Sequence, residues 1–174
     1  RFMNDPVLVD VVGKQGSRLS ATCTHQAIQV HPRGVMNVVR DLIAMHDTTA
    51  IVFFETKSEV HSIADEGWAI LSGDLSQKLR EETLARFRAG KVKYLAATDV
   101  AARGLDIDDV ELVINMGLPK DYESYIHRSG RTGRAGKTGI SIALIGARDE
   151  SLVQYISRKT GVTFNKIGAP QPAD

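Results

Sequence analysis

Cysteine is almost absent from this sequence, because Cys23 is the only one in 174 residues and no disulfide can form within the chain. That composition suits a reducing compartment. No apolar run approaches the roughly 20 residues that a membrane-spanning helix needs, and no secretory signal is visible. The formal net charge of +1 excludes a global basic field, so any binding of nucleic acid must come from a local patch. The chain begins with Arg1 rather than Met, which suggests a fragment of a longer protein.

The composition is that of one globular domain, with 43% hydrophobic and 25% charged residues. Short apolar runs predict buried strands at 22–30, 50–54, 68–71, 94–98, 111–116 and 140–145. Apolar residues at helical spacing predict helices at 34–46, 57–66, 76–90 and 148–161, and a further helix that begins at 121. Strands alternate with helices across short links. This order indicates an α/β fold in which helices cover both faces of a parallel sheet.

The segment 76–90 is the clearest helix of the sequence. Ser76 is predicted to be its N-cap, and Leu79, Leu84 and Phe87 are predicted to form its buried face.

Ligands of open parallel sheets bind beyond the carboxyl ends of the strands. Polar residues follow three predicted strands at that point: "ETK" after 50–54, "SGD" after 68–71 and "TDVAARGLD" after 94–97. Of the adjacent Phe53 and Phe54, one is expected to face the core and the other the site.

The stretch "HRSGRTGRAG" at 127–136 carries arginines at every third position, namely Arg128, Arg131 and Arg134. On a helix, this spacing would place them within one broad face, since successive members are offset by about 60°. Its three glycines would spoil a regular helix but let the backbone approach a ligand closely. Guanidinium groups bind phosphate through paired donors. A phosphate or transition-state clamp is one interpretation, and a solvated basic loop is the other.

The stretch "ATDVAARGLDI" at 97–107 places a hydroxyl and two carboxylates after a buried strand. Thr98 can donate to a backbone phosphate, Asp106 can accept from a ribose hydroxyl, and Arg103 can pair with either acid. The alternative is a tight turn in which Asp99 and Asp106 act only as caps.

The stretch "SGDLSQKLREE" offers weaker signals. Gly73 permits close approach of the backbone, and Gln77 and Arg80 share one helical face from which they can contact a nucleic-acid backbone. A surface Gln and Arg on a helix are also ordinary.

The sequence does not supply a complete site for nucleotide hydrolysis. "AGKTG" at 135–139 resembles a phosphate-binding loop, but Arg131 stands where that motif requires glycine, and the segment precedes a strand rather than a helix. No Asp-Glu-Ala-Asp stretch offers a magnesium site. The five histidines lack metal-ligand spacing, so no metal site is predicted.

Four segments taken together, "IVFFET", "SGDLSQKLRE", "ATDVAARGLDI" and "YIHRSGRTGRAG", resemble in order and spacing the second RecA-like lobe of DEAD-box RNA helicases. The resemblance covers roughly 22–160 and leans toward the nucleolar Gu-type and organellar branches. It implies a RecA-like three-layer fold over 22–162, preceded by an interdomain connector at 1–21 and followed by a tail at 163–174.

The resemblance also implies roles for single residues. Arg131 and Arg134 would be arginine fingers for the γ-phosphate of ATP, which the absent first lobe of the same protein holds with Mg²⁺. His127 and Arg128 would couple to the acidic motif of that lobe, and Asp106 would bind the ATP ribose. The residues expected to hold the RNA sugar-phosphate backbone, largely without sequence preference, are Gly73, Gln77, Arg80, Thr98, Asp99 and Arg103. ATP and RNA would close the lobes together and separate short duplexes locally.

The sequence departs from the family in two places. The link between "FFETK" and "LSGD" is about five residues shorter than expected, and Ser72 stands where the family more often has histidine.

Further expectations follow for the chain as a whole. An isolated lobe is expected to have negligible ATPase activity. The resemblance implies an intracellular protein without a membrane partner, and leaves open the nucleolus, an organelle or the cytoplasm, and the oligomeric state. Two alternatives are the lobe of a DNA helicase or translocase, and a non-catalytic module that binds RNA or protein.

Overall fold

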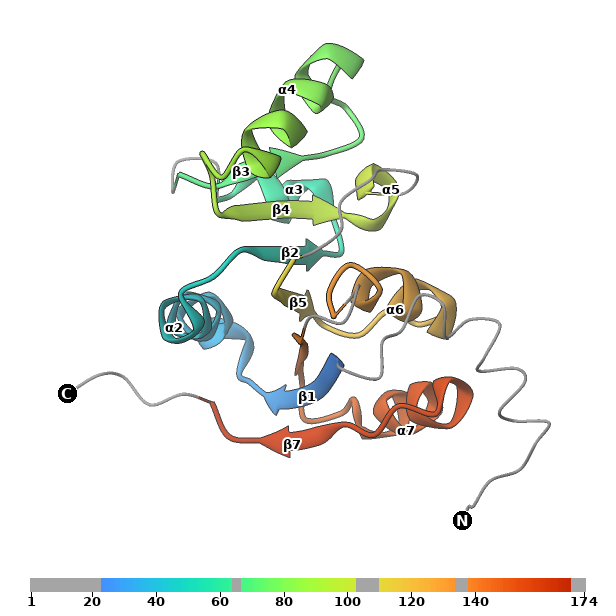
Figure 1. Ribbon diagram of the computed structural model, residues 1–174. Coiled ribbons are helices and arrows are strands. Elements are labelled where there is room, and N and C mark those ends of the chain that lie inside the picture. Colours follow the sequence, from blue (N-terminus) through green and yellow to red (C-terminus); the bar gives the residue numbers. More distant parts are fainter. Residues whose placement is uncertain (1–22, 64–66, 103–109, 134–137, 170–174) are drawn as a thin grey trace.

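The computed structural model describes residues 23–63, 67–102, 110–133 and 138–169. Within these ranges, seven strands form one parallel sheet in the order β3-β4-β2-β5-β6-β1-β7 (Figure 1). The strands are β1 Cys23–Gln29, β2 Ala50–Phe54, β3 Ala69–Leu71, β4 Tyr94–Thr98, β5 Leu112–Met116, β6 Gly139–Ile145 and β7 Asn165–Ile167. The helices are η1 Pro32–Gly34, a 3-10 turn, and α2 Val35–His46, α3 Lys57–His61, α4 Gln77–Arg88, α5 Asp99–Ala102, α6 Tyr122–Ser129 and α7 Glu150–Thr160.

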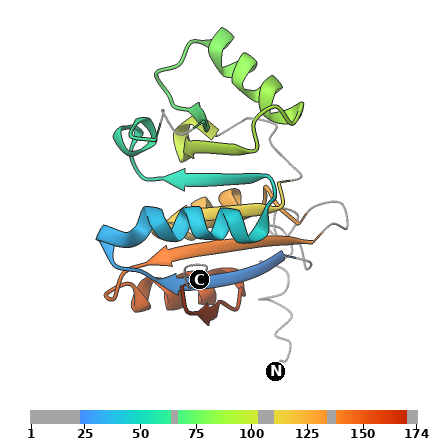
Figure 2. The ribbon, with the colours of Figure 1, turned by 90° about the vertical axis from the view of Figure 1, so that its left-hand side faces the viewer.

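Helices cover both faces of the sheet, as the alternation of strands and helices predicts. Figure 2 shows α2 lying across the strands on one face, with α6 behind the sheet. Buried side chains of α2 and α3 share one cluster, while those of α4 and α5 belong to a second cluster. The α/β fold with a parallel sheet is therefore confirmed.

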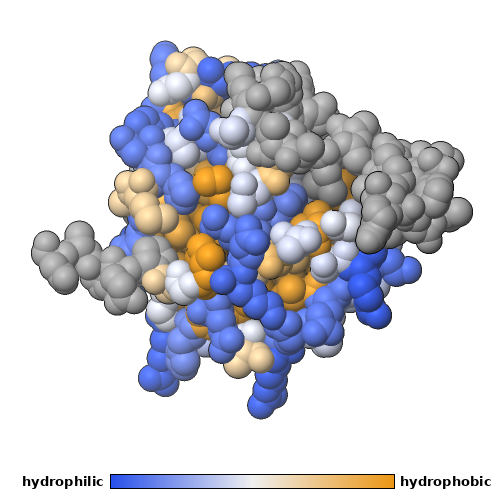
Figure 3. All heavy atoms as spheres, turned by 60° about the horizontal axis from the view of Figure 1, so that its bottom comes forward, coloured by the Kyte–Doolittle hydropathy of each residue, from blue (hydrophilic) through white to orange (hydrophobic). Residues whose placement is uncertain are grey.

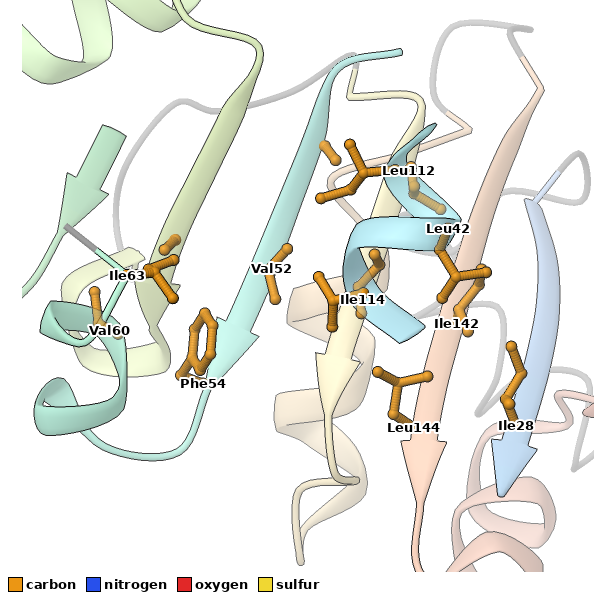
Figure 4. Packing of buried hydrophobic residues seen from close by; sticks show 14 residues of the cluster. Ile28, Leu42, Val52, Phe54, Val60, Ile63, Leu112, Ile114, Ile142 and Leu144 are labelled. Carbon is orange, nitrogen blue, oxygen red and sulfur yellow. The ribbon is translucent and has the colours of Figure 1, made fainter. Parts of the chain in front are cut away.

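The strand β2 explains why both faces need a cover. All five of its residues are buried, and its side chains alternate between the two clusters. Val52 and Phe54 lie in the α2 cluster, which Figure 4 shows from close by, whereas Ile51 and Phe53 lie in the α4 cluster. Burying an apolar side chain of this size contributes about 1.5–3 kcal/mol, so a continuous apolar run is stable only between two layers of helices.

Helix α4 begins where the sequence predicts, but one residue of its first turn, Leu79, is not buried as predicted. The Ser76 side chain accepts a hydrogen bond from the Leu79 backbone N–H at 3.2 Å, so Ser76 is the N-cap. Leu84 and Phe87 are buried, whereas Leu79 is 48% exposed. The predicted place of Leu79 on the buried face is wrong, because five residues of helix turn it about 140° away from Leu84.

One short element, α5, escapes the prediction, and one helix, α3, is shorter than predicted. The pattern indicates a helix over 57–66, whereas α3 ends at His61, with 64–66 outside the described residues. The four residues of α5 form a helix where only a turn is expected. None of the described helices is long and apolar enough to cross a membrane.

The strand β7 lies inside the segment 163–174, for which the sequence predicts a tail. It pairs in parallel with β1, and all three of its residues are exposed. Figure 3 views the molecule from this side and shows mostly polar surface with small apolar patches. Residues 165–167 therefore extend the sheet at its edge.

Candidate functional site

Two of the predicted RNA-contacting residues, Gly73 and Thr98, lie at the carboxyl ends of neighbouring strands. β3 and β4 pair side by side in parallel, so the loop that follows β3 and the residues that follow β4 meet at one edge of the sheet. Gly73 lies in the first loop and is exposed, while Thr98 ends β4 and is 9% exposed. The structure thus brings these two predicted residues to a common edge.

The loop after β3 is organised by a small polar cluster. The Ser72 hydroxyl donates to the Asp74 carboxylate and lies 3.3 Å from His61 Nε2. His61 Nε2 in turn lies 3.6 Å from Asp74 Oδ1. The hydrogen bond from Ser72 and, to a smaller extent, the charge of His61 lower the pKa of Asp74. Ser72 therefore fixes the Asp74 carboxylate beside Gly73.

The end of β4 turns directly into α5. Thr98 Oγ1 accepts a hydrogen bond from the Ala101 backbone N–H at 3.4 Å, which is the geometry of a cap. The alternative interpretation of this stretch assigns capping to Asp99 and Asp106, whereas the cap observed here is Thr98. Asp99 instead points its carboxylate at another element.

Asp99 and Arg128 form a bidentate ion pair between α5 and α6. Arg128 Nε and Nη2 each donate to a carboxylate oxygen of Asp99 at 2.7 Å. The Arg128 side chain is only 6% exposed and that of Asp99 31%. The guanidinium carbon lies 5.4 Å from the ring centre of Phe53. Paired and stacked in this way, the charge of Arg128 is satisfied inside its own lobe.

A pocket lies between α5 and α6 over Phe53, and α5 and α6 cover the same side of the sheet (Figure 1). Its lining residues are Phe53, Asp99, Ala102, Ser124, His127, Arg128 and Arg131. Phe54 packs instead in the core with Val60 and Ile63 (Figure 4). Phe54 therefore faces one core cluster, while Phe53 packs in the other cluster and also lines the pocket. That this pocket is the site stays a prediction.

The C-terminal carbonyls of α5 receive two arginines from distant segments. Arg80 Nη2 donates to the Ala101 carbonyl at 3.0 Å, and Arg131 Nη2 donates to the Ala102 carbonyl at 3.2 Å. Guanidinium groups suit this end of a helix, where carbonyls lack intrahelical partners. Arg80 Nε is buried without a hydrogen-bond partner within the described residues. Residues predicted for RNA and for ATP thus converge on one short helix.

The turn that carries Arg131 is fixed by backbone contacts. Helix α6 ends at Ser129 with Gly130 as its C-cap, so Arg128 and Arg131 do not share a helical face. The Val110 backbone N–H donates to the Arg131 carbonyl at 3.1 Å. Gly133 has a φ of 71°, which glycine adopts without strain. Although no helix joins them, both arginines line the same pocket.

The sequence and the fold both match known helicases. The model of the helicase conserved C-terminal domain matches residues 34–136. The chain is 44% identical over 174 residues to the human ATP-dependent RNA helicase DDX50, covering 95% of this chain and 24% of that protein. It is 41% identical over 174 residues to nucleolar RNA helicase 2 of Rattus norvegicus, covering 95% and 22%. The chain belongs to the helicase conserved C-terminal domain family, in its DEAD-box branch. It spans less than a quarter of the length of these relatives.

Solved DEAD-box structures share the fold of this lobe. A DEAD box protein from Methanococcus jannaschii matches with a TM-score of 0.76 and 35% identity over 84% of this chain and 42% of that chain. The C-terminal domain of Dbp5 matches with a TM-score of 0.78 and 27% identity over 84% and 91%. S. cerevisiae Dbp5 bound to RNA and ADP BeF3 matches with a TM-score of 0.76 and 28% identity over 88% and 44%. The predicted RecA-like fold is confirmed.

Three predicted site residues of the DEAD-box lobe, Arg103, Asp106 and Arg134, lie outside the described residues. Gln77 is exposed and donates from Nε2 to Glu81 at 3.1 Å. Within the described part of the chain, no group of three or more His, Cys, Asp or Glu is placed to hold a metal ion.

Sequence reasoning missed two polar residues near the pocket of this DEAD-box lobe. Ser124 lines the pocket, and Asn115 Oδ1 accepts a hydrogen bond from Arg128 Nη1. The one signal for Asn115 was available in "LVINM", where a single polar side chain interrupts a buried strand.

Proposed function

We propose that this lobe forms the second half of an ATP-dependent RNA helicase and presents Arg131 and Arg134 to the γ-phosphate of ATP held by the first lobe. The pocket over Phe53 carries this proposal, because His127 and Arg131 line it beside the paired Arg128. A guanidinium at this place fits the phosphate of a nucleotide that another domain delivers.

In this proposal the nucleotide would be held mainly by the first lobe. The described residues offer the pocket cationic side chains but no cluster of acids for Mg²⁺, so the proposal leaves the metal and the triphosphate to the first lobe. ATP would supply the free energy of the cycle, and Asp106 would bind its ribose. His127 would couple to the acidic motif of the first lobe. A similar coupling by Arg128 requires its pair with Asp99 to open.

RNA would bind along the carboxyl edge of β3 and β4. The proposed contacts are Gly73, Gln77, Arg80, Thr98, Asp99 and Arg103, all directed to the sugar-phosphate backbone. The exposed Gly73 supports this arrangement, since nothing lies within 4 Å of the place of a side chain there. The match to Dbp5 bound to RNA and ADP BeF3 supports both ligands. Backbone contacts of this kind carry no sequence information.

The whole protein would then separate short duplexes as its two lobes close over ATP and RNA. The lobe by itself is expected to turn over ATP negligibly. We also infer an intracellular protein, and the nucleolar relatives make the nucleolus the first compartment to examine.

The test is ATP hydrolysis by the full-length protein that contains this lobe, measured with single-stranded RNA, with DNA of the same sequence and without nucleic acid. The proposal predicts stimulation by RNA only, together with ATP-dependent separation of a short RNA duplex. Stimulation by DNA alone would point to a DNA helicase or translocase. No hydrolysis under any condition would leave a non-catalytic binding module.

A matched pair of variants tests the RNA edge. Arg80→Ala is expected to weaken RNA affinity about tenfold and equally for all sequences, because it removes a backbone contact. Arg86→Ala removes an exposed arginine from the same helix and is expected to leave RNA affinity within about twofold of the parent. Equal losses in the two variants would contradict the assignment of Arg80.

A further inference from the structure

A chain of polar side chains is buried beneath α6. His25 Nδ1 lies 2.6 Å from the Tyr125 hydroxyl, which lies 3.2 Å from Ser141 Oγ. Ser141 Oγ is also 2.8 Å from Ser129 Oγ. Asn115 Nδ2 donates to Ser141 Oγ at 3.4 Å. The chain thus runs from β1 through α6 and β6 to β5.

Asn115 joins this network to the ion pair in the pocket. Its Nδ2 also donates to the Ile142 carbonyl at 3.1 Å, and its Oδ1 accepts from Arg128 Nη1 at 3.4 Å. The orientation of the amide follows from these partners, since an arginine only donates and a carbonyl only accepts. Asn115 is fully buried, with an exposed fraction of 0%.

Asn115 is a polar residue in an otherwise apolar stretch of β5. The rest of β5 is apolar, with Leu112, Val113 and Ile114 all buried. Burying a polar side chain costs free energy unless its hydrogen bonds are made, and an apolar side chain of similar size usually packs as well. Of the partners of Asn115 described above, Arg128 is the one that lines the pocket.

Arg128 is held from every side. Asp99 accepts from Nε and Nη2, while Asn115 and the Gly117 carbonyl accept from Nη1. Arg128 lies in the last turn of α6, and Arg131 follows three residues later in the turn fixed by Val110. The contacts of the Arg128 guanidinium therefore help to fix the end of α6 and the position of the turn that carries Arg131.

We propose that Asn115 is a positioning residue, which orients the Arg128 guanidinium against Asp99 and thereby places the turn that carries Arg131. This inference rests on the proposed function, in which Arg131 meets the γ-phosphate. Asn115 touches no reactant and acts only through Arg128.

The test replaces Asn115 by leucine, which is apolar and of similar size, in the full-length protein. The proposal predicts that kcat of RNA-stimulated ATP hydrolysis falls about 10- to 100-fold, because small misplacements of a transition-state group are costly. The KM for ATP, the RNA affinity and the midpoint of thermal unfolding should stay near the parent values. Thr160→Val is the matched control, since Thr160 is 2% exposed and bonds only near the end of α7, and its kcat should not change.

A double variant separates positioning from general damage. In an Arg131→Lys background, Asn115→Leu is expected to lower kcat no further, since its effect passes through the turn that carries Arg131. A full additional loss would overturn the proposal, and so would a parent-like kcat of the single variant. A kcat loss matched by a lower unfolding midpoint would reduce Asn115 to a structural role and equally overturn it.

A second readout is independent of ATP hydrolysis. In the full-length protein with ¹⁵N-labelled arginine, the Nε–H proton of Arg128 should exchange with water at least tenfold faster in Asn115→Leu than in Thr160→Val. Unchanged exchange would overturn the positioning role even in an active helicase. Faster exchange in a protein without ATPase activity would uphold the contact while the proposed function fails.

Discussion

At the scale of single residues, Gly139 has no room for a side chain. A Cβ at this position would lie 2.3 Å from Thr132 Oγ1 and 2.4 Å from the Gly133 nitrogen. Since Thr132 and Gly133 follow Arg131, a side chain at position 139 would push the turn that carries Arg131 away from the start of β6. The Gly133 nitrogen belongs to the backbone, so it cannot move aside as the end of a flexible side chain can.

Gly139→Ala is therefore expected to lower the free energy of unfolding of the lobe by about 1–3 kcal/mol, measured by urea denaturation. Gly34→Ala is the control, because nothing lies within 4 Å of its Cβ position, and it should change stability by less than about 0.5 kcal/mol. Equal stability of the two variants would show that the turn relaxes freely.

A second residue-scale prediction concerns pH. Burial lowers the pKa of His25 from 6.5 to about 4. Between these two values the unfolded chain binds a proton that the folded lobe refuses, so stability falls as the pH decreases. The contribution of His25 is fully present above pH 6.5 and lost as the pH falls toward about 4.

Urea unfolding of the lobe should therefore show a loss of about 2 kcal/mol between pH 7 and pH 5. His25→Gln keeps a polar partner for Tyr125 and should abolish most of that loss. A loss of the same size in the variant would mean that other groups cause the pH dependence.

At the scale of elements, the ion pair of Asp99 and Arg128 ties α5 to α6. Asp99→Asn leaves the mostly buried guanidinium without its counter-charge, and is expected to destabilise the lobe by about 2 kcal/mol, below the usual 3–5 because Asp99 is partly exposed. Lys166→Gln is the control, since it breaks an exposed pair with Glu150 and should cost less than about 1 kcal/mol. The two free energies of unfolding, measured side by side, decide whether the pair contributes as argued; equal costs would contradict it.

The sequence predicts well the elements that are made almost entirely of apolar residues. β2, β4 and β6 are apolar runs whose residues are nearly all buried between the two layers of helices. β7 has no buried residue and exists because β1 offers it an edge. α5 has only four residues, too few for a periodic pattern, and Arg80 and Arg131 hold its carbonyls from far along the chain. Elements made by such tertiary contacts leave little signal in local sequence.

The site residues also divide into those that the sequence predicts and those that it does not. The order of the segments predicts that several of them lie near one another, and Arg128 and Arg131 do line one pocket. From the sequence, Arg103 was a possible partner of Asp99, because a sequence pattern relates only residues that are close along the chain. The structure pairs Asp99 with Arg128, which lies 29 residues away. Pairing across elements is decided by packing, and the sequence alone does not state it.

At the scale of the whole molecule, the proposed function gives this lobe half of a site. The Phe53 pocket brings cationic side chains to one place, and the relatives extend to more than four times the matched length. Catalysis in this account requires a second lobe to bring the nucleotide to Arg131. ATP turnover by the isolated lobe should therefore be indistinguishable from background, with or without RNA, and measurable turnover would contradict the division of labour between lobes.

The most direct test of the central claim is kcat for RNA-stimulated ATP hydrolysis in the full-length protein carrying Arg131→Ala, with ATP affinity measured in parallel. Arg158→Ala, an exposed arginine of α7, is the matched control. The account predicts a loss of roughly 10³- to 10⁵-fold in kcat, the range measured for arginine fingers, with ATP affinity nearly unchanged and the control unaffected. Normal turnover by Arg131→Ala would contradict it, and Arg131 would then serve only to hold the end of α5.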